Sequence, residues 1–165
     1  MSPRITVLRA DITTVEVDAV VTAANSRLVG GSGVNGAVHA AAGPELLEAS
    51  RALAPCPPGS AVVTPAFGLR TAQWVVHAVG PKYRGPDDAA VLASAYTSAL
   101  ARADEVGASS IAFPSISTGI YGYPDGEAAR VSVAALRGAQ TRVERIVLVA
   151  FGRRTELLWS TELAG

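Results

Sequence analysis

The sequence predicts a three-layer α/β/α domain whose central sheet is mixed but mostly parallel and has about six strands. Short apolar runs rich in Val and Ile alternate along the chain with longer alanine-rich stretches. Each apolar run is about as long as a strand buried on both faces, and this alternation is typical of a parallel sheet covered by helices. The 165 residues contain no internal repeat and no composition break, so we expect residues 1–165 to form a single domain.

Six runs have the length and composition expected of buried strands. These runs are Ile5–Leu8, Ala19–Ala23, Ala61–Thr64, Trp74–Val79, Ile111–Pro114 and Val143–Phe151. Other stretches carry helix signals, such as Pro44 at a first helical position and Gly107 directly after a long alanine-rich stretch. These stretches are Pro44–Leu53, Asp88–Val106, Asp125–Gln140 and Arg154–Leu163.

Charge and composition exclude several classes of protein. The chain carries 14 basic and 14 acidic residues with no block of like charge, so bulk electrostatic binding to nucleic acid or to an anionic membrane is not expected. A hydrophobic content of 49% excludes a disordered chain. The single cysteine, Cys56, allows no intrachain disulfide, and no apolar run approaches the ~20 residues of a membrane span. No signal peptide is visible after Met1, so we expect a cytoplasmic protein.

Two glycine-rich loops are the most informative feature of the sequence. The first spans residues 25–36 and the second residues 115–122, and each follows an expected strand. A helix is expected after each loop, beginning near Ala37 and at Asp125. In open α/β sheets such loops converge outside the carboxyl ends of the strands, where their N–H groups bind phosphate oxygens. The alternative is that both clusters are ordinary turns; their shared position after strands favours a phosphate site.

Several nucleotide-binding motifs are absent or misplaced. Residues Gly31–Gly36 spell G-x-G-x-x-G, but six residues, Asn25–Gly30, separate these glycines from the strand. The nearby acids Glu45 and Glu48 fall in an expected helix rather than at the end of a second strand, so we reject a dinucleotide-dependent dehydrogenase. The chain has no G-x-x-x-x-G-K-[ST] and no G-x-S-x-G, which gives no support to a P-loop NTPase or a nucleophile elbow.

The histidines and the cysteine give weaker signals. His77 lies inside a strand-like run, where we interpret it as a core residue, and Cys56 lies in a proline-rich turn without a basic neighbour, where we interpret it as structural. His39 follows Asn35 by four residues, so both face the same way on a helix, and His39 is equally compatible with a place near a ligand or away from it. The sequence predicts no zinc site, because no close His, Cys or carboxylate spacing occurs.

Several separated motifs, in order, resemble those of the macro domain family, most closely its MacroD-type branch. They are Asp11-Ile12, residues 17–26, residues 30–36, residues 39–43, residues 77–81 and residues 113–124. The resemblance runs from about residue 5 to residue 151. It implies the macro-domain sandwich, a protein that binds ADP-ribose and ADP-ribosylated proteins, and no cofactor. We also expect a monomer.

The resemblance implies a role for each matching residue. Asp11 matches the aspartate that accepts a hydrogen bond from the adenine amino group, with a backbone contact from Ile12 beside it, and Asn25 matches the asparagine that holds the distal ribose. Phe151 lies where the family often places a residue against the adenine. The residues implied to flank the diphosphate are Gly31, Ser32, Gly33, Val34, Ser117, Thr118, Gly119, Ile120 and Tyr121, the last of which packs on the distal ribose. Without the resemblance, Asp11 would be interpreted as a cap and Asn25 as an Asx turn.

Two positions depart from the family pattern. Thr22 stands where the family has the first asparagine of N-A-A-N, and Asn35 stands where hydrolytic MacroD-type members have an aspartate. A neutral amide has no basic lone pair in the useful pKa range. We therefore expect a phosphate oxygen of the substrate to activate water, with Asn25 and Asn35 positioning water and ribose. His39 completes the candidate catalytic set as a proton donor or phosphate contact.

These observations lead to one main hypothesis and two alternatives. The main hypothesis is an enzyme that hydrolyses mono-ADP-ribose esters on acidic side chains of proteins, together with O-acyl esters such as O-acetyl-ADP-ribose. The first alternative is a module that recognises ADP-ribose without turnover, which Asn35 favours. The second is an enzyme of unrelated chemistry that acts on another nucleotide.

Overall fold

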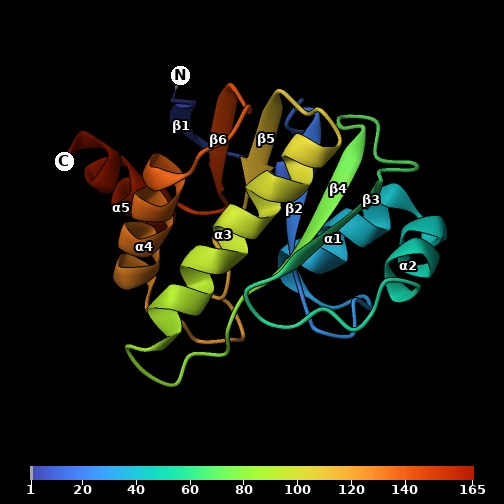
Figure 1. Ribbon diagram of the computed structural model, residues 1–165, viewed down its shortest axis with the longest axis horizontal. Helices are drawn as coiled ribbons and strands as arrows, with labels where there is room; N and C mark the ends of the chain where they lie inside the picture. Colours follow the sequence, from blue (N-terminus) through green and yellow to red (C-terminus); the bar gives the residue numbers. More distant parts are fainter. Residues whose placement is uncertain (1) are drawn as a thin grey trace.

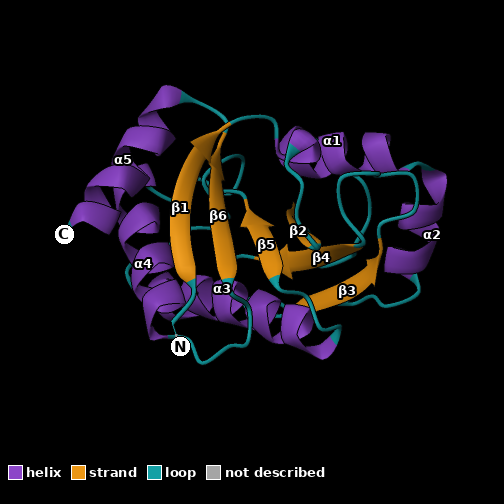
Figure 2. Cartoon of the chain, turned by 90° about the horizontal axis from the view of Figure 1, so that it is seen from above, coloured by secondary structure: helices purple, strands orange, loops and turns teal. Residues whose placement is uncertain are grey.

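The computed structural model describes residues 2–165, and over these residues the chain forms a six-stranded sheet between two layers of helices (Figures 1 and 2). The strands are β1 (Arg4–Arg9), β2 (Ala19–Ala24), β3 (Ala61–Pro65), β4 (Trp74–Val79), β5 (Ser110–Phe113) and β6 (Arg145–Ala150). Their order across the sheet is β1-β6-β5-β2-β4-β3. Every neighbouring pair is parallel except β3 with β4. The predicted three-layer fold with a mixed, mostly parallel sheet is confirmed.

Helices cover both faces of this sheet (Figure 2). The helices are α1 (Gly33–Ala42), α2 (Pro44–Arg51), α3 (Asp88–Glu105), α4 (Asp125–Gly138) and α5 (Arg153–Ala164), with a short 3-10 helix η1 (Ile12–Thr14). Residues of α3, α4 and α5 pack against one face in a single apolar cluster, whereas α1, the start of α2 and η1 pack against the other face. Among the described residues, none of these helices is long and apolar enough to cross a bilayer.

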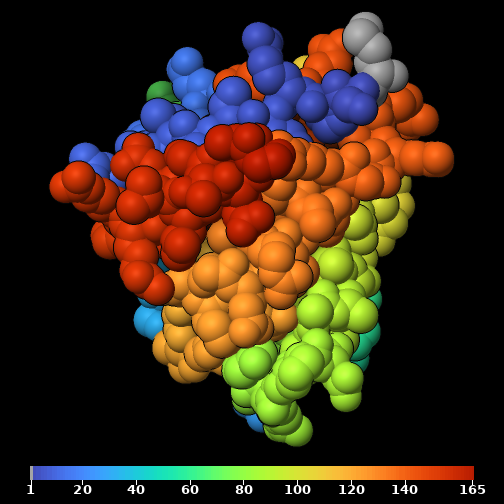
Figure 3. Space-filling view, turned by 90° about the vertical axis from the view of Figure 1, so that its left-hand side faces the viewer, coloured from blue at the N-terminus to red at the C-terminus, as the bar shows by residue number. Residues whose placement is uncertain are grey.

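The burial of each strand explains its composition. All four residues of β5 and the last five of β6 are buried, because helices cover both faces, so these strands are continuous apolar runs. The edge strand β1 alternates between exposed and half-buried residues over most of its length. Figure 3 shows α5 lying across this N-terminal strand and against α4. Trp159 anchors the helix there, fully buried with its Nε1 donating to Ser132 Oγ at 3.0 Å.

Helix α1 begins at Gly33, not near Ala37, so the predicted start of this helix is wrong. Its first turn closes with Gly36 N–H donating to the Ser32 carbonyl at 3.3 Å. Glycine has low helix propensity, which hid this turn in the sequence. Gly36 is required there for space, because a Cβ at this position would lie 2.5 Å from the Gly31 carbonyl oxygen. The other helix boundaries lie within two residues of those expected.

Candidate functional site

A cavity of about 640 Å³ opens at the carboxyl ends of the parallel strands. Its two main walls are the loops that follow β2 and β5, which are parallel neighbours in the sheet, so both loops leave the same edge. The segments that follow β1 and β6 extend the cavity to one side. These loops lie at the bottom of Figure 1. Small-molecule sites are typically cavities of roughly 300–1,000 Å³, so a cavity of this size at this edge of the sheet suits a small-molecule ligand.

The structure brings almost all of the predicted site residues to this cavity. Those that line it are Asp11, Ile12, Asn25, Gly31, Ser32, Gly33, Val34, Asn35, Ser117, Thr118, Gly119, Ile120, Tyr121 and Phe151. His39 is the exception, since it does not line the cavity. Residues outside the predicted set also line it, among them Asp125 and Thr155, which come from α4 and α5.

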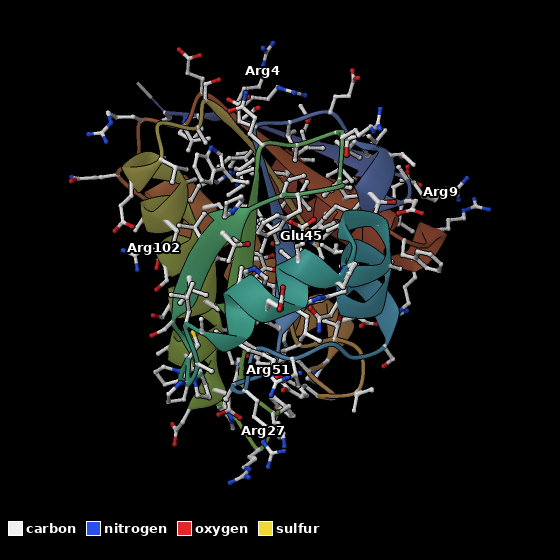
Figure 4. The ribbon with its side chains drawn as sticks, turned by 90° about the vertical axis from the view of Figure 1, so that its right-hand side faces the viewer. Arg4, Arg9, Arg27, Glu45, Arg51 and Arg102 are labelled. Atoms are coloured by element: carbon white, nitrogen blue, oxygen red, sulfur yellow. The ribbon has the colours of Figure 1, made fainter. Side chains whose placement is uncertain are left out.

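The first loop is closed by the side chain of Asn25. Asn25 Nδ2 donates to the Val29 carbonyl at 3.1 Å, and Val29 N–H donates to Asn25 Oδ1 at 3.2 Å. This pair of bonds holds a tight turn in which Leu28 has a positive φ of 55°. Behind the turn, Ser50 Oγ donates to the Leu28 carbonyl at 2.7 Å. Arg27 projects from the loop at the end of the molecule opposite Arg4 (Figure 4). Asn25 therefore closes the turn through its two hydrogen bonds and also lines the cavity.

Asn35, on the first turns of α1, reaches the same carbonyl group. Its Nδ2 donates to the Val29 carbonyl at 3.1 Å, and its Oδ1 accepts from Thr22 Oγ1 at 3.0 Å. Thr22 is fully buried on β2, and Asn35 is 5% exposed. Two carboxamides, from residues 25 and 35, thus converge on one backbone oxygen beside the cavity.

The second loop is held by hydrogen bonds from α3 and from the segment that follows β4. Tyr96, buried on α3, accepts from Ile116 N–H at 3.0 Å and donates to the Pro114 carbonyl at 3.2 Å. Its burial raises the pKa of the phenol well above the ordinary value, so it stays a neutral donor. Ser117 has a positive φ of 69° and donates from Oγ to the Pro81 carbonyl at 2.7 Å. Gly80 leaves room for this hydroxyl, since a Cβ there would lie 2.2 Å from Ser117 Oγ.

Strain at Ser117 is consistent with a loop built for function rather than for stability. A positive φ on a residue with a side chain costs of order 1–3 kcal/mol and persists only where the surroundings impose it. The bond to Pro81 and the Tyr123 N–H that donates to the Ser117 carbonyl at 2.9 Å impose it here. The loop is therefore held in its path before any ligand arrives.

Charged groups flank the cavity at its ends. Asp11 Oδ1 accepts from Thr13 Oγ1 at 2.7 Å and from Thr13 N–H at 2.9 Å, and these bonds lower the pKa of the Asp11 carboxyl. Asp11 is thus the N-cap of η1, and it is also an exposed carboxylate on the cavity wall. Asp125 pairs with Arg154 at 3.0 Å. On the other side of the second loop, Lys82 Nζ lies 5.7 Å from the centre of the Tyr121 ring.

The catalytic assignment of His39 is not supported by its position. Four residues along a helix add about 6 Å of rise beyond Asn35, which carries His39 past the cavity even though both share a face. The His39 ring lies beside the buried His77 ring, with 6.2 Å between centroids. Partial burial lowers the pKa of His39. The interpretation of His77 as a core residue agrees with its complete burial on β4.

Asp125 and Thr155, two of the lining residues that were missed, differ in how far the sequence could have indicated them. Asp125 is the first residue of α4, directly after the second loop, so its place next to that loop could have been inferred. Thr155 lies in the first turn of α5. Only the packing of α5 on the sheet brings it to the cavity, and no local pattern carries that information.

Comparisons with known proteins agree with this geometry. A sequence model of the Macro domain family matches residues 21–132 of the chain. The chain is 49% identical to a macro domain-containing protein of Ralstonia nicotianae, with 94% of this chain and 92% of that protein covered. It is 48% identical to a protein of Citrobacter rodentium named O-acetyl-ADP-ribose deacetylase, with 96% and 94% covered.

Solved structures are similar over nearly the whole chain. A mutant of the Oceanobacillus iheyensis macrodomain, solved with ADPR, is 36% identical and superposes with a TM-score of 0.90 over 99% of this chain and 93% of that one. The Trypanosoma brucei macrodomain in complex with ADP-ribose is 33% identical, with a TM-score of 0.89 over 98% of this chain and 69% of that one.

Proposed function

The chain belongs to the macro domain family, and from that premise we propose that it binds ADP-ribose in the cavity described above and hydrolyses esters of ADP-ribose. The substrates are mono-ADP-ribose esters on acidic side chains of proteins and O-acetyl-ADP-ribose. A relative 48% identical to this chain is named O-acetyl-ADP-ribose deacetylase, which supports this class of bond. Both substrates share one chemical feature, an acyl group on an oxygen of the terminal ribose.

The observation that carries the proposal is the convergence of two amide-lined loops and two carboxamides on one cavity. The adenine lies between Asp11, which accepts from its amino group, and the exposed ring of Phe151. The diphosphate lies between the two loops, where backbone N–H groups bind its oxygens without a lysine. The terminal ribose then lies beside Asn25 and Asn35, whose amides donate to oxygen atoms.

The chemistry transfers the acyl group from the ribose oxygen to water. The oxygen of a water molecule attacks the acyl carbon, and the bond between that carbon and the ribosyl oxygen breaks. One water proton passes to a phosphate oxygen of the substrate and then to the departing ribose oxygen, so the products are the free acid and ADP-ribose. Asn35 is neutral and cannot take this proton, so it acts by position.

The decisive experiment offers the protein two substrates, O-acetyl-ADP-ribose and a protein ADP-ribosylated on glutamate. We expect release of ADP-ribose from both, and a loss of at least about tenfold in rate for Asn25→Ala. The matched control is Gln140→Ala, which removes an exposed amide in the segment after α4 and leaves the rate unchanged. No release above the Asn25→Ala level contradicts the proposal.

The turnover experiment and binding calorimetry together decide between the alternatives. Binding of ADP-ribose by calorimetry without turnover identifies a reader module, the function that the neutral side chain of Asn35 favours. Failure to bind ADP-ribose while another nucleotide binds identifies an enzyme of different chemistry.

Asn35→Asp is expected to raise the rate of hydrolysis by about tenfold and to change the affinity for ADP-ribose by less than about threefold. A carboxylate adds a base next to the ribose, although it also faces the Val29 carbonyl oxygen, which limits the gain. Initial rates measured from pH 5 to 9, with calorimetric Kd values, test this expectation. Asn35 precedes Gly36, and such a pair can lose ammonia to form a cyclic imide that water opens to aspartate and isoaspartate, so the intact mass of the unmutated protein is checked first. An unchanged rate places residue 35 outside the chemistry.

A further inference from the structure

We propose that Thr22 is a positioning residue that fixes the carboxamide of Asn35 in one orientation, so that residue 35 offers the cavity an N–H donor. The orientation itself follows from contacts within the chain. Its effect on hydrolysis rests on the function proposed above.

The two hydrogen bonds of Asn35 assign its amide atoms. In the orientation described, Oδ1 faces the Thr22 hydroxyl and Nδ2 faces the Val29 carbonyl. A flipped amide would put Oδ1 about 3.1 Å from the Val29 oxygen, so two acceptors would face each other with no proton between them. The Thr22 hydroxyl gives its single proton to Oδ1, which makes this orientation the satisfied one.

Burial makes the Thr22 contact costly to lose. Thr22 is fully buried and Asn35 is 5% exposed, so water does not replace the hydroxyl at Oδ1. A buried polar atom without a partner is unfavourable. Without the hydroxyl, the only remaining bond of this side chain among the described residues is Nδ2 to Val29, so Oδ1 has no partner and the amide is held at one end only.

The oxygen and nitrogen of the amide lie on different sides. Oδ1 points to β2, inside the domain, whereas Nδ2 lies next to Val29 and 3.4 Å from where a Cβ of Gly31 would be. Gly31 lines the cavity, so the nitrogen side of Asn35 is the side near the ligand. An amide nitrogen has two protons, and the Val29 carbonyl uses one. The second proton is the group available to a substrate oxygen.

A donor at this place acts on the departing ribose oxygen. Negative charge develops on that oxygen as the bond to the acyl carbon breaks, and a fixed N–H stabilises the charge without reorganisation. The contact strengthens toward the transition state, so Thr22 influences kcat more than KM. Thr22 itself touches no substrate.

The test uses two substitutions that differ by one hydroxyl. Thr22→Val keeps the shape of the side chain and removes the donor, and we expect kcat to fall by about tenfold with KM within about twofold. Thr22→Ser retains the hydroxyl, and we expect kcat within about threefold of the unmutated protein. In an Asn35→Ala background, Thr22→Val is expected to have no further effect. Equal losses in Thr22→Val and Thr22→Ser, or a loss that persists in the Asn35→Ala background, overturn the proposal.

A second measurement needs no turnover and separates this proposal from the function. The chain has two asparagines and two glutamines, so a ¹H–¹⁵N spectrum contains four side-chain NH₂ pairs. In the ligand-free protein we expect Thr22→Val to displace the Asn35 pair and leave the two glutamine pairs in place, whereas Thr22→Ser leaves all four near their original positions. An Asn35 pair that does not move in Thr22→Val overturns the proposal even if the protein hydrolyses both esters. A displaced pair supports it even if the protein only binds ADP-ribose.

Discussion

Gly119→Glu is expected to weaken ADP-ribose binding by at least about a hundredfold, which corresponds to about 2.7 kcal/mol. Gly119 lies in the middle of the second loop and lines the cavity. A glutamate side chain there would fill space next to the diphosphate and bring a negative charge toward two others. Titration calorimetry with ADP-ribose measures the loss.

The fold leaves this substitution free of structural cost, which makes the result interpretable. A Cβ at Gly119 would meet no atom within 4 Å, and the residue is exposed. Gly119→Gln separates the effect of size from the effect of charge. Gly138→Glu, at the exposed C-terminal end of α4, places the same side chain in open space far from the cavity. If Gly119→Glu binds as tightly as Gly138→Glu, the ligand lies elsewhere.

Acid is expected to destabilise the protein through His77 by about 3 kcal/mol between pH 7 and pH 4. Burial, with a smaller contribution from His39, lowers the pKa of His77 to about 4, whereas in the unfolded chain a histidine takes up its proton near pH 6.5. Between these values the unfolded state binds more protons. The stability is therefore complete above about pH 7 and is lost as the pH falls toward 4. Denaturant unfolding at pH 7, 5.5 and 4.5 measures the slope.

The variant His77→Gln tests the origin of that slope. The Thr64 hydroxyl donates to the Pro65 carbonyl at 3.0 Å, so His77 Nε2, 3.0 Å from Thr64 Oγ1, carries the proton of their shared bond. A glutamine amide offers a comparable donor and does not titrate. We expect the free energy of unfolding of this variant to be nearly flat from pH 6.5 to 4.5, apart from a small contribution of His39, whose pKa is also lowered. A slope as steep as that of the unmutated protein would assign the acid sensitivity to other groups. The carboxyls of Asp11 and Asp18, whose pKa values lie below the ordinary value, titrate at lower pH.

The strands and most helices could be predicted because their signals are local. β5 and β6 are buried on both faces, and such strands must be apolar throughout. The order of the strands could not be predicted, because β1 lies next to β6 through contacts between opposite ends of the chain. The antiparallel edge strand β3 has the same kind of composition as the parallel strands of the sheet. The start of α1 was missed because glycine has low helix propensity, whereas here Gly33 adopts a positive φ of 61° and Gly36 packs closely against the Gly31 carbonyl.

In the candidate site, too, the features with local sequence signals could be predicted and those that depend on tertiary packing could not. The loops after β2 and β5 were predicted from glycines that follow strands, and the structure places both on one cavity. Asp11 and Phe151 came only from the resemblance to a family, since each is unremarkable in its local sequence. His39 was wrongly expected at the site, because two residues on the same face of a helix can lie one turn apart along the helix axis. The bond between Thr22 and Asn35 was beyond sequence reasoning, because it depends on which way a helix docks onto a strand.

The support that Tyr96 gives to the second loop has a consequence for engineering. The phenol hydrogen-bonds the backbone at Pro114 and Ile116 from the core, and neither of these bonds involves residues 119 and 120, which are exposed, whereas Thr118 bonds back to Ser115 within the loop. Positions 119 and 120 can therefore be randomised in a library without losing the path of the main chain, and altered ligand preference can be selected there. A library that includes position 96 would yield mainly clones whose loop has lost its anchor.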